Sequence, residues 1–460
     1  MKKASFFILV LFICILQVKA QTDDMLARPT VDKRVELLSV VFRLVGNPEY
    51  NKNSFKLYTD RIESHFAPYK DHELIQLGRS LVKSNGVAYD AVMSMAVNLD
   101  ERLNLPKNYG TLDQRWDRKE VARFVKLLKK FAKESRFDTF YHENEALYKE
   151  AVNHFMPIYE SVDVKWYNDF YGHKSKERFR IILSMSNGPG NYGSNTINKQ
   201  GVRNVFSIMG AWKTNLDGMV IYPPEAVLPT LIHEFNHSFV RFDQEMFRAS
   251  GQQIYTVVGQ QMASQAYGDW PIVLTEAMVR AAVIKYMKDH NFPANEIAKE
   301  VAMQKLRGFV WIGKLVDELD KYASARESYP TLESYMSRLA EVYVDFAQYT
   351  VNYDEMRPKI VSIDEFVNGH KTINSNTKSI TINFDRPLMG RGYSFNNSRL
   401  GKDAFPKIRG VNYTNENRTV VVEVELQPAK EYGMTLLGFS FCTPEGDGMK
   451  PYELTFKTME

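Results

Sequence analysis

Hydrophobic residues recur with the period of an α-helix over the first third of the chain. The first such segment ends at residues 46–48, Gly-Asn-Pro, and its apolar face consists of Val35, Leu38, Val41, Phe42 and Val45. The same period returns over residues 74–82, 121–131 and 145–156. We therefore predict an N-terminal helical region over residues 21–160.

The segments that follow are shorter and typical of β-strands. Residues 179–183, 204–209 and 219–222 are rich in β-prone side chains, and glycine, asparagine or proline bounds them. After two prolines the helical period returns and continues to about residue 353, with interruptions expected near Gly251 and at 268–271. This pattern predicts a domain over residues 161–356 in which a small sheet precedes a mainly helical part.

The last hundred residues change character again. Short alternating segments, separated by turn residues, occupy 379–384, 419–426, 432–437 and 452–457. They predict an all-β domain over residues 357–460. The whole chain is therefore expected to be an α+β protein.

The first 20 residues have the pattern of a secretory signal peptide. Two lysines precede an apolar run over residues 6–16, and small residues before Gln21 provide a cleavage site. A lipoprotein signal centred on Cys14 is the alternative, which the bulky Ile13 disfavours. We expect an exported protein, located in the periplasm, at the cell surface or in the medium. No later segment is apolar for long enough to cross a membrane.

The expected mature chain carries almost no net charge. The 59 Lys and Arg residues become 56 when the three lysines of the signal are removed, against 55 Asp and Glu. Nucleic acids and anionic membranes require clustered positive charge, so we do not expect nucleic acid as a partner. Only Cys442 remains after cleavage, and stability must therefore come from burial rather than from an internal disulfide.

Residues 231–239, Leu-Ile-His-Glu-Phe-Asn-His-Ser-Phe, place two histidines four positions apart on a predicted helix. Four residues are just over one turn, so His233 and His237 project from one face and can hold one zinc ion at ~2.0–2.1 Å from each ring nitrogen. Glu234 lies about 100° around the helix, where it can take a proton from a zinc-bound water without ligating the metal. The motif predicts a catalytic zinc site.

Two other His-Glu pairs in the chain act as internal controls. His72 and His142 are each followed by glutamate, but neither has a second histidine four positions later. We interpret both as ordinary structural or surface histidines.

Catalytic zinc needs a third protein ligand, and Glu276 is the best candidate. It stands in a strongly apolar predicted helix, where an unpaired carboxylate would be costly. An ion pair to Arg280, one turn later, is the alternative, and the two roles are compatible. Asp243 and Glu245 are rivals that follow His237 by less than three turns on what we expect to be the same helix.

The motif, followed 39 residues later by Glu276, resembles the gluzincins, the zinc metallopeptidase group that includes thermolysin. The resemblance covers roughly residues 175–290. It implies that His233, His237 and Glu276 are metal ligands, that Glu234 is the general base, and that residues 219–222 form an edge strand along which a peptide could lie. Many gluzincins carry an acid at the position of Arg280, so the residue that orients His233 is unassigned. The residue that stabilises the oxyanion is also unassigned, and the candidates are Tyr255, Tyr267, Tyr286 and His290.

The region after Pro358 resembles bacterial Ig-like domains of the surface-layer type. The resemblance rests on residues 380–389, Ile-Thr-Ile-Asn-Phe-Asp-Arg-Pro-Leu-Met, and on 426–432. Such domains are usually spacers or adhesive modules, which implies association with the cell envelope. The order of signal, helical region, zinc motif and Ig-like tail also resembles uncharacterised exported bacterial proteins.

Together these observations predict an exported, zinc-dependent metallopeptidase with a zincin-like catalytic domain and an Ig-like β-sandwich. Its substrate would be a peptide or protein, hydrolysed by a zinc-activated water with Glu234 as general base. A cell-surface binding or scaffold protein with a structural or vestigial zinc site is the alternative. A third possibility keeps the metal chemistry and changes the substrate to a non-peptide amide.

Overall fold

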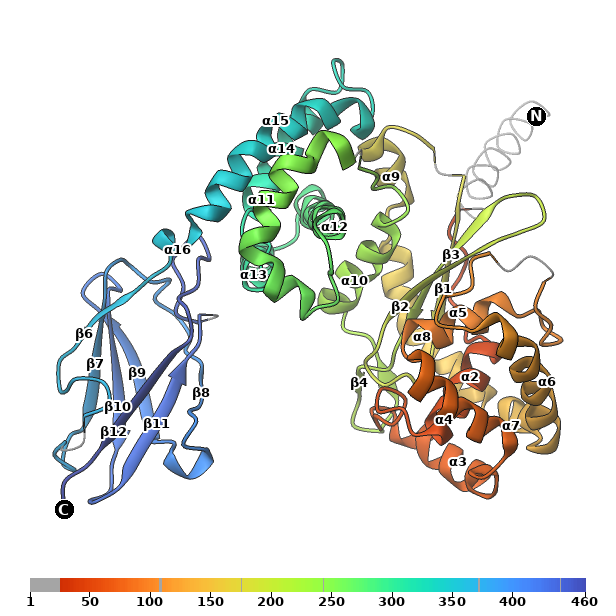
Figure 1. The fold of residues 1–460 in the computed structure, drawn as a ribbon, viewed down its shortest axis with the longest axis horizontal. Helices are drawn as coiled ribbons and strands as arrows, with labels where there is room; N and C mark the ends of the chain where they lie inside the picture. The colour runs from red at the N-terminus through yellow and green to blue at the C-terminus, as the bar shows by residue number, and fades with distance from the viewer. Residues whose placement is uncertain (1–24, 107–109, 175, 243, 371–372, 439) are drawn as a thin grey trace, which may run out of the picture. The chain divides into compact units, whose positions relative to one another are not determined.

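The computed structural model describes residues 25–460, except 107–109, 175, 243, 371–372 and 439 (Figure 1). The expected signal peptide, residues 1–20, lies outside the described residues. The chain divides into two compact units, the first ending at Phe239 and the second beginning at Val240. Both units combine helices with strands, which confirms the α+β class. Among the helices of the described residues, none is long and apolar enough to cross a membrane.

The first unit begins with helices, and those predicted from the sequence are confirmed. Asp32 accepts a hydrogen bond from the Arg34 amide at the start of α2, and Gly46, with a φ of 104°, ends that helix. The helices are α2 (Lys33–Val45), α3 (Lys56–Phe66), α4 (Glu73–Asn85), α5 (Asp90–Asn98), α6 (Arg118–Glu134), α7 (Phe137–Glu143), α8 (Glu145–Ser161), α9 (Val164–Tyr171) and α10 (Pro224–Asn236); a 3-10 turn, η1 (Ala67–Tyr69), follows α3.

A three-stranded sheet with the order β1-β3-β2 lies in the same unit. Its strands are β1 (Arg178–Leu183), β2 (Tyr192–Ile197) and β3 (Arg203–Met209). The central strand, β3, pairs parallel with β1 and antiparallel with β2. Isolated bridges from Leu26 and Thr30 cover the outer side of β1. The strand β2 was not predicted, and it forms the other edge of the sheet.

The prediction that residues 219–222 belong to this sheet is wrong. Within that segment β5 (Val220–Ile221) pairs with β4 (Lys213–Thr214) in a separate two-stranded ribbon. The carbonyl oxygen of Val220 lies 2.7 Å from Nδ1 of His154 on α8. A main-chain group of β5 is therefore already in contact with a side chain outside the ribbon. The physical reason is the tight turn at 215–218, which folds the segment back on β4 before it can reach β3.

The second unit opens with a set of helices: α11 (Gln244–Ala263), α12 (Trp270–Asp289), α13 (Ala294–Leu306), α14 (Ile312–Ser324), α15 (Leu332–Val351) and α16 (Tyr353–Met356). The interruption expected at 268–271 is confirmed, since Asp269 caps α12 by accepting from the Ile272 amide at 3.0 Å. The prediction of an interruption near Gly251 is wrong, since α11 continues through this residue. The glycine instead makes room for the Trp270 ring, which packs where a side chain at position 251 would stand.

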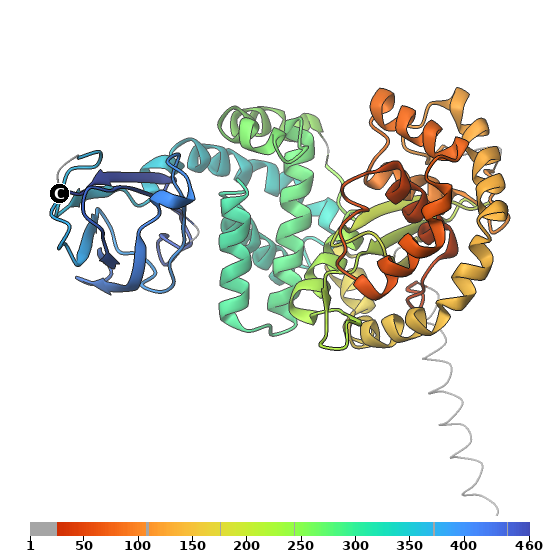
Figure 2. The same ribbon diagram turned by 90° about the horizontal axis from the view of Figure 1, so that it is seen from below.

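Two sheets, drawn in the blue part of the ribbon in Figure 2, follow. They enclose a common apolar core. One has the order β6-β7-β10-β9 and the other β12-β11-β8. Their strands are β6 (Ile360–Ile363), β7 (Ser379–Phe384), β8 (Phe395–Asn397), β9 (Lys407–Thr414), β10 (Thr419–Glu425), β11 (Glu431–Leu436) and β12 (Tyr452–Lys457), with η2 (Lys402–Ala404) between β8 and β9. The four predicted strands β7, β10, β11 and β12 are confirmed, whereas β6, β8 and β9 were missed.

Polar contacts join the helical and β parts of the second unit. Lys305 on α13 forms an ion pair with Asp447 at 2.8 Å, and both side chains are almost fully buried. Arg357 donates hydrogen bonds to the carbonyl oxygens of Gly448 and Met449. The domain boundary that we predict at 356–357 is therefore bridged by contacts. It remains a prediction, as does the boundary at 160–161.

The buried carboxyl of Glu36 on α2 should make the first unit less stable as the pH rises. Burial, partly offset by hydrogen bonds from the Met185 amide, Tyr58 and Ser184, raises the Glu36 pKa to about 7. The folded chain then binds more protons than the unfolded chain between about pH 4.5 and 7, so unfolding free energy should fall over that window by up to about 3 kcal/mol. Denaturant titrations at pH 5 and pH 8 measure this fall. Glu36→Gln should abolish it, and an unchanged fall in that variant would assign it to other groups.

Candidate metal centre

The helix α10 carries the two motif histidines. It starts at Pro224, whose fixed φ suits the first helical position, and its last residue is Asn236. His237 follows as the C-cap residue and keeps a right-handed helical conformation, with φ −55° and ψ −26°. His233 and His237 therefore still share one face. Their Nε2 atoms lie 3.2 Å apart and their ring centroids 4.8 Å apart.

This spacing suits two ligands of one metal ion. Two nitrogens at ~2.0–2.1 Å from a tetrahedral zinc are separated by ~3.3 Å. The helix that holds them is firmly packed, since Leu231, Ile232 and Phe235 are buried. Asn236, also buried, accepts a hydrogen bond from the Tyr171 hydroxyl at 3.1 Å. The helix that carries the histidines is thus held both by the packing of its apolar side chains and by the hydrogen bond to Asn236.

Glu234 lies against the edge strand β2. A methyl group added to Gly193 would come within 2.6 Å of Oε2 of Glu234, so the carboxylate occupies the space that a side chain at position 193 would need. Glu234 is half-buried, and Gly193 is exposed. The proposed base therefore stands beside the open edge of the sheet.

Glu276 lies on α12 and is buried, with 8% of its surface exposed. Its Oε2 accepts a hydrogen bond from the Tyr267 hydroxyl at 3.3 Å and lies 3.1 Å from Nη2 of Arg280. The ion pair between Glu276 and Arg280, which the sequence offered as the alternative role of this carboxylate, is present. Arg280 itself donates to Gln304 and lies over the ring of Phe309, at 5.2 Å from the centroid.

His233, His237 and Glu276 form a set of possible metal ligands. Each offers one ligand atom, and these atoms lie within 4.8 Å of one another. Within the described parts of the chain, this is the one group of three or more His, Cys, Asp or Glu side chains so arranged. Two imidazoles and one carboxylate form the donor set of a catalytic zinc site that keeps an open position, so the residues present fit that metal.

Asp243 and Glu245 were the alternative candidates for the third ligand. The premise that Glu245 continues the helix of His237 is wrong, because α10 ends at Asn236 and Glu245 lies on α11, which begins at Gln244. Glu245 is exposed and pairs with Arg248. Asp243 lies outside the described residues.

The candidate oxyanion stabilisers have local partners. Tyr255 donates to the carbonyl oxygen of Tyr267, and Tyr286 is buried with its ring 3.8 Å from that of His290. Tyr267 contacts Glu276 directly. Burial, followed by the charge of Glu276, raises the Tyr267 pKa.

The two control histidines have structural partners, as interpreted from the sequence. Nδ1 of His72 accepts from the Leu74 amide and caps α4, while its Nε2 lies 3.2 Å from Glu134. His142 lies 2.7 Å from Glu145 on the surface.

Comparison with known proteins gives a family but no activity. The model of a family described as "Domain of unknown function (DUF4932)" matches residues 29–342. No curated protein matches the chain. Among solved structures, the chain is similar to surface layer protein SbsC, domains 1-6, at 13% identity and a TM-score of 0.17, covering 54% of this chain and 35% of that one. The N-terminal part of SbsC also gives 13% identity and 0.17, with coverages of 51% and 64%. The chain thus spans about a third to two thirds of these structures, and TM-scores of this size carry no argument about fold.

Proposed function

This chain belongs to the DUF4932 family, and we propose that it is a zinc-dependent hydrolase of peptide bonds. The observation that supports the proposal best is the set formed by His233, His237 and Glu276, whose ligand atoms lie within 4.8 Å of one another. We propose these three residues as the metal ligands and Glu234 as the general base.

Zinc bound by these residues would supply a Lewis acid that makes water more acidic and polarises a carbonyl group. The residues of the chain divide the remaining work. Glu234 accepts a proton from the attacking water as the water oxygen bonds to the carbonyl carbon. When the carbon–nitrogen bond breaks, the same carboxyl returns the proton to the departing amine nitrogen. Tyr267 and Arg280 hold Glu276 in position.

A peptide is a better substrate than a small amide because of the strand beside Glu234. The strand β2 is an edge strand whose residues after Tyr192 are half-buried or exposed. An extended peptide can add to such an edge through main-chain hydrogen bonds. The substrate edge is thus assigned to residues 193–197, in place of residues 219–222.

The same proposal includes export. The signal pattern of residues 1–20 directs the chain out of the cytoplasm, and the β-sandwich after Pro358 suits an Ig-like module that associates with the cell envelope. The fold of the helices around the site is proposed to be zincin-like.

Metal analysis of the purified chain, combined with cleavage of a proteome-derived peptide library, tests the function. One zinc per chain and zinc-dependent cleavage are expected, with loss of cleavage after chelation. The alternative, a surface binding protein with a structural or vestigial site, draws support from the Glu276–Arg280 ion pair, which compensates the carboxylate without metal. Stoichiometric zinc without any cleavage would favour it.

Gly193→Ala should reduce hydrolysis while leaving the metal in place. The new methyl group competes with Oε2 of Glu234 for one space, so the flexible carboxylate must rotate away from its position. We expect kcat to fall at least about tenfold, because a displaced base transfers protons less efficiently. Ser194→Ala, on the same strand, is the matched control. Unchanged kcat in Gly193→Ala would show that this carboxylate position is not the active one.

A further inference from the structure

Tyr89 has a backbone conformation that suits glycine and is strained for other residues. It precedes α5 with φ 53° and ψ −126°. Strain of this kind persists only where surrounding contacts enforce it. The Tyr89 side chain is 51% exposed, so burial of the ring does not offset that strain.

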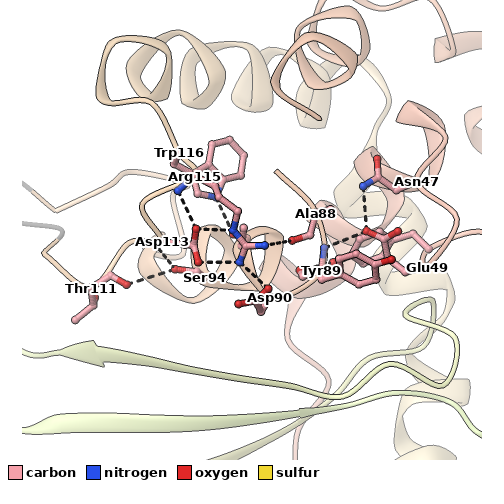
Figure 3. A network of polar contacts seen from close by, with 12 residues as sticks. Asn47, Glu49, Ala88, Tyr89, Asp90, Ser94, Thr111, Asp113, Arg115 and Trp116 are labelled. Atoms are coloured by element: carbon pink, nitrogen blue, oxygen red, sulfur yellow. Dashed lines mark hydrogen bonds and ion pairs between the residues drawn. The ribbon is translucent and has the colours of Figure 1, made fainter. Parts of the chain in front are cut away.

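Two neighbouring side chains hold the Tyr89 backbone, and one of them, Glu49, is labelled in Figure 3. The carboxylate of Glu49 accepts from the Tyr89 amide at 3.0 Å, and the Tyr50 hydroxyl donates to the Tyr89 carbonyl at 2.9 Å. Glu49 is itself buried, with 8% exposed, and also accepts from the amide of the Asn47 side chain at 3.0 Å. A buried carboxylate thus binds both the Asn47 side chain and the backbone amide of the strained Tyr89.

Arg115 fixes the residues on either side of Tyr89, as the dashed lines in Figure 3 show. Its guanidinium donates to the carbonyl of Ala88 at 3.4 Å and to Asp90 at 2.6 Å. Asp113 orients that guanidinium through a bond of 2.8 Å to Nε. The backbone of residues 88–90 is therefore held firmly, which fixes the point from which the exposed Tyr89 side chain projects.

The side chain so presented lines a cavity of about 350 Å³. Its apolar wall includes Val45, Pro48 and Val82 as well as Tyr89. Arg79 and Lys83 supply positive charge, and Glu49, whose carboxylate is already bonded to Asn47 and Tyr89, also lines the cavity. Arg79 donates to the carbonyl oxygens of Leu44 and Lys70. In the part of the chain that the structure describes, neither cation forms an ion pair.

We propose that this cavity binds a small carboxylate with an aromatic or branched apolar body. The carboxylate would pair with Arg79 and Lys83, and the body would pack between the Tyr89 ring and the aliphatic wall. A volume of 350 Å³ is near the lower end of ligand pockets, ~300–1,000 Å³, so the site takes about one amino-acid-sized group. The site explains why the chain maintains a strained, exposed aromatic residue on a buried polar support, and it does not depend on the proposed hydrolysis.

Calorimetric titration of the whole chain with N-acetyl-phenylalanine tests the proposal. Saturable binding is expected, and N-acetyl-phenylalanine amide should bind at least about tenfold more weakly because it lacks the charge that pairs with Arg79. A tetrapeptide ending in phenylalanine separates two sources of the carboxylate: tighter binding than the amino acid identifies a peptide end, and equal binding a free acid. Absence of binding by all three probes overturns the proposal.

Tyr89→Gly is the decisive variant, because glycine adopts this backbone conformation without strain. The fold should be as stable as the wild type or more so, while binding falls at least about tenfold. Arg79→Gln should remove the preference for the acid over the amide, and Lys126→Gln on α6 is the control for a lost surface charge. Wild-type binding by Tyr89→Gly, or a lower melting temperature in that variant, would show that the tyrosine serves packing and would overturn the proposal.

Discussion

Glu234→Gln is expected to keep its zinc and lose its hydrolytic activity. The amide has nearly the shape of the carboxylate but cannot accept a proton from water, so kcat should fall by about 10²–10⁴, the contribution typical of a general base. Glu234 is not a proposed ligand, and metal content and melting temperature should stay close to the wild type. Initial rates on a cleaved library peptide, measured beside metal analysis, give the two readouts.

Glu225→Gln is the matched control for this variant. Glu225 is an exposed carboxylate in the first turn of the same helix, α10. Its replacement removes the same charge from the same element and should leave turnover unchanged. Turnover at the wild-type rate in Glu234→Gln would refute the proposed mechanism, whatever the metal content.

Glu276→Ala and Arg280→Ala should separate two roles of one buried carboxylate. If Glu276 is the third ligand, its removal should weaken zinc binding by more than about 100-fold, beyond the 10–100-fold typical of residues that only support a ligand. Removal of Arg280 breaks a pair whose side chains are only 10% and 11% exposed, and should cost about 3–5 kcal/mol of stability. Its effect on zinc affinity should stay within the 10–100-fold typical of a residue that supports a ligand, and so below that of Glu276→Ala. Competition titration with a chelator and denaturant unfolding measure the two quantities.

The assignment of the third ligand depends on the contrast between these variants. Retention of wild-type zinc affinity by both would mean that Glu276 serves only the ion pair with Arg280. Glu245→Ala is a useful control, because that exposed carboxylate pairs with Arg248 and should not affect the metal.

The sequence predicts best those elements whose signal is local. The apolar face of α2 and the glycine after it, or the alternation along β7, lie within one short segment, and the structure confirms both. The strand β2 has the sequence Tyr-Gly-Ser-Asn-Thr-Ile, with little hydrophobic alternation, because it is a partly exposed edge. Its extended conformation comes from pairing with β3, and a pattern within residues 192–197 cannot predict that pairing.

The same distinction holds for the candidate site. The spacing of His233 and His237 is a property of one helix, so it could be predicted. Glu276 could be suggested because a carboxylate in an apolar helix needs compensation, and the structure places Arg280 and Tyr267 against it. The closeness of Gly193 to Glu234 depends on how β2 packs beside α10. The glycine-rich stretch at 188–193 was the available signal, but it does not indicate which side chain fills the space.

The position of His237, one residue past the last helical residue of α10, has a consequence for dynamics. Helix ends fray, and the last carbonyl groups of a helix carry partial negative charge that attracts cations. A metal held by His233 and His237 would therefore fasten the terminal turn to the turn before it. Amide protons at 236–239 should exchange more slowly with solvent deuterium in zinc than after chelation, while those at the start of α10 should not change. Hydrogen exchange would thus detect metal binding as local ordering of a helix end, without any substrate.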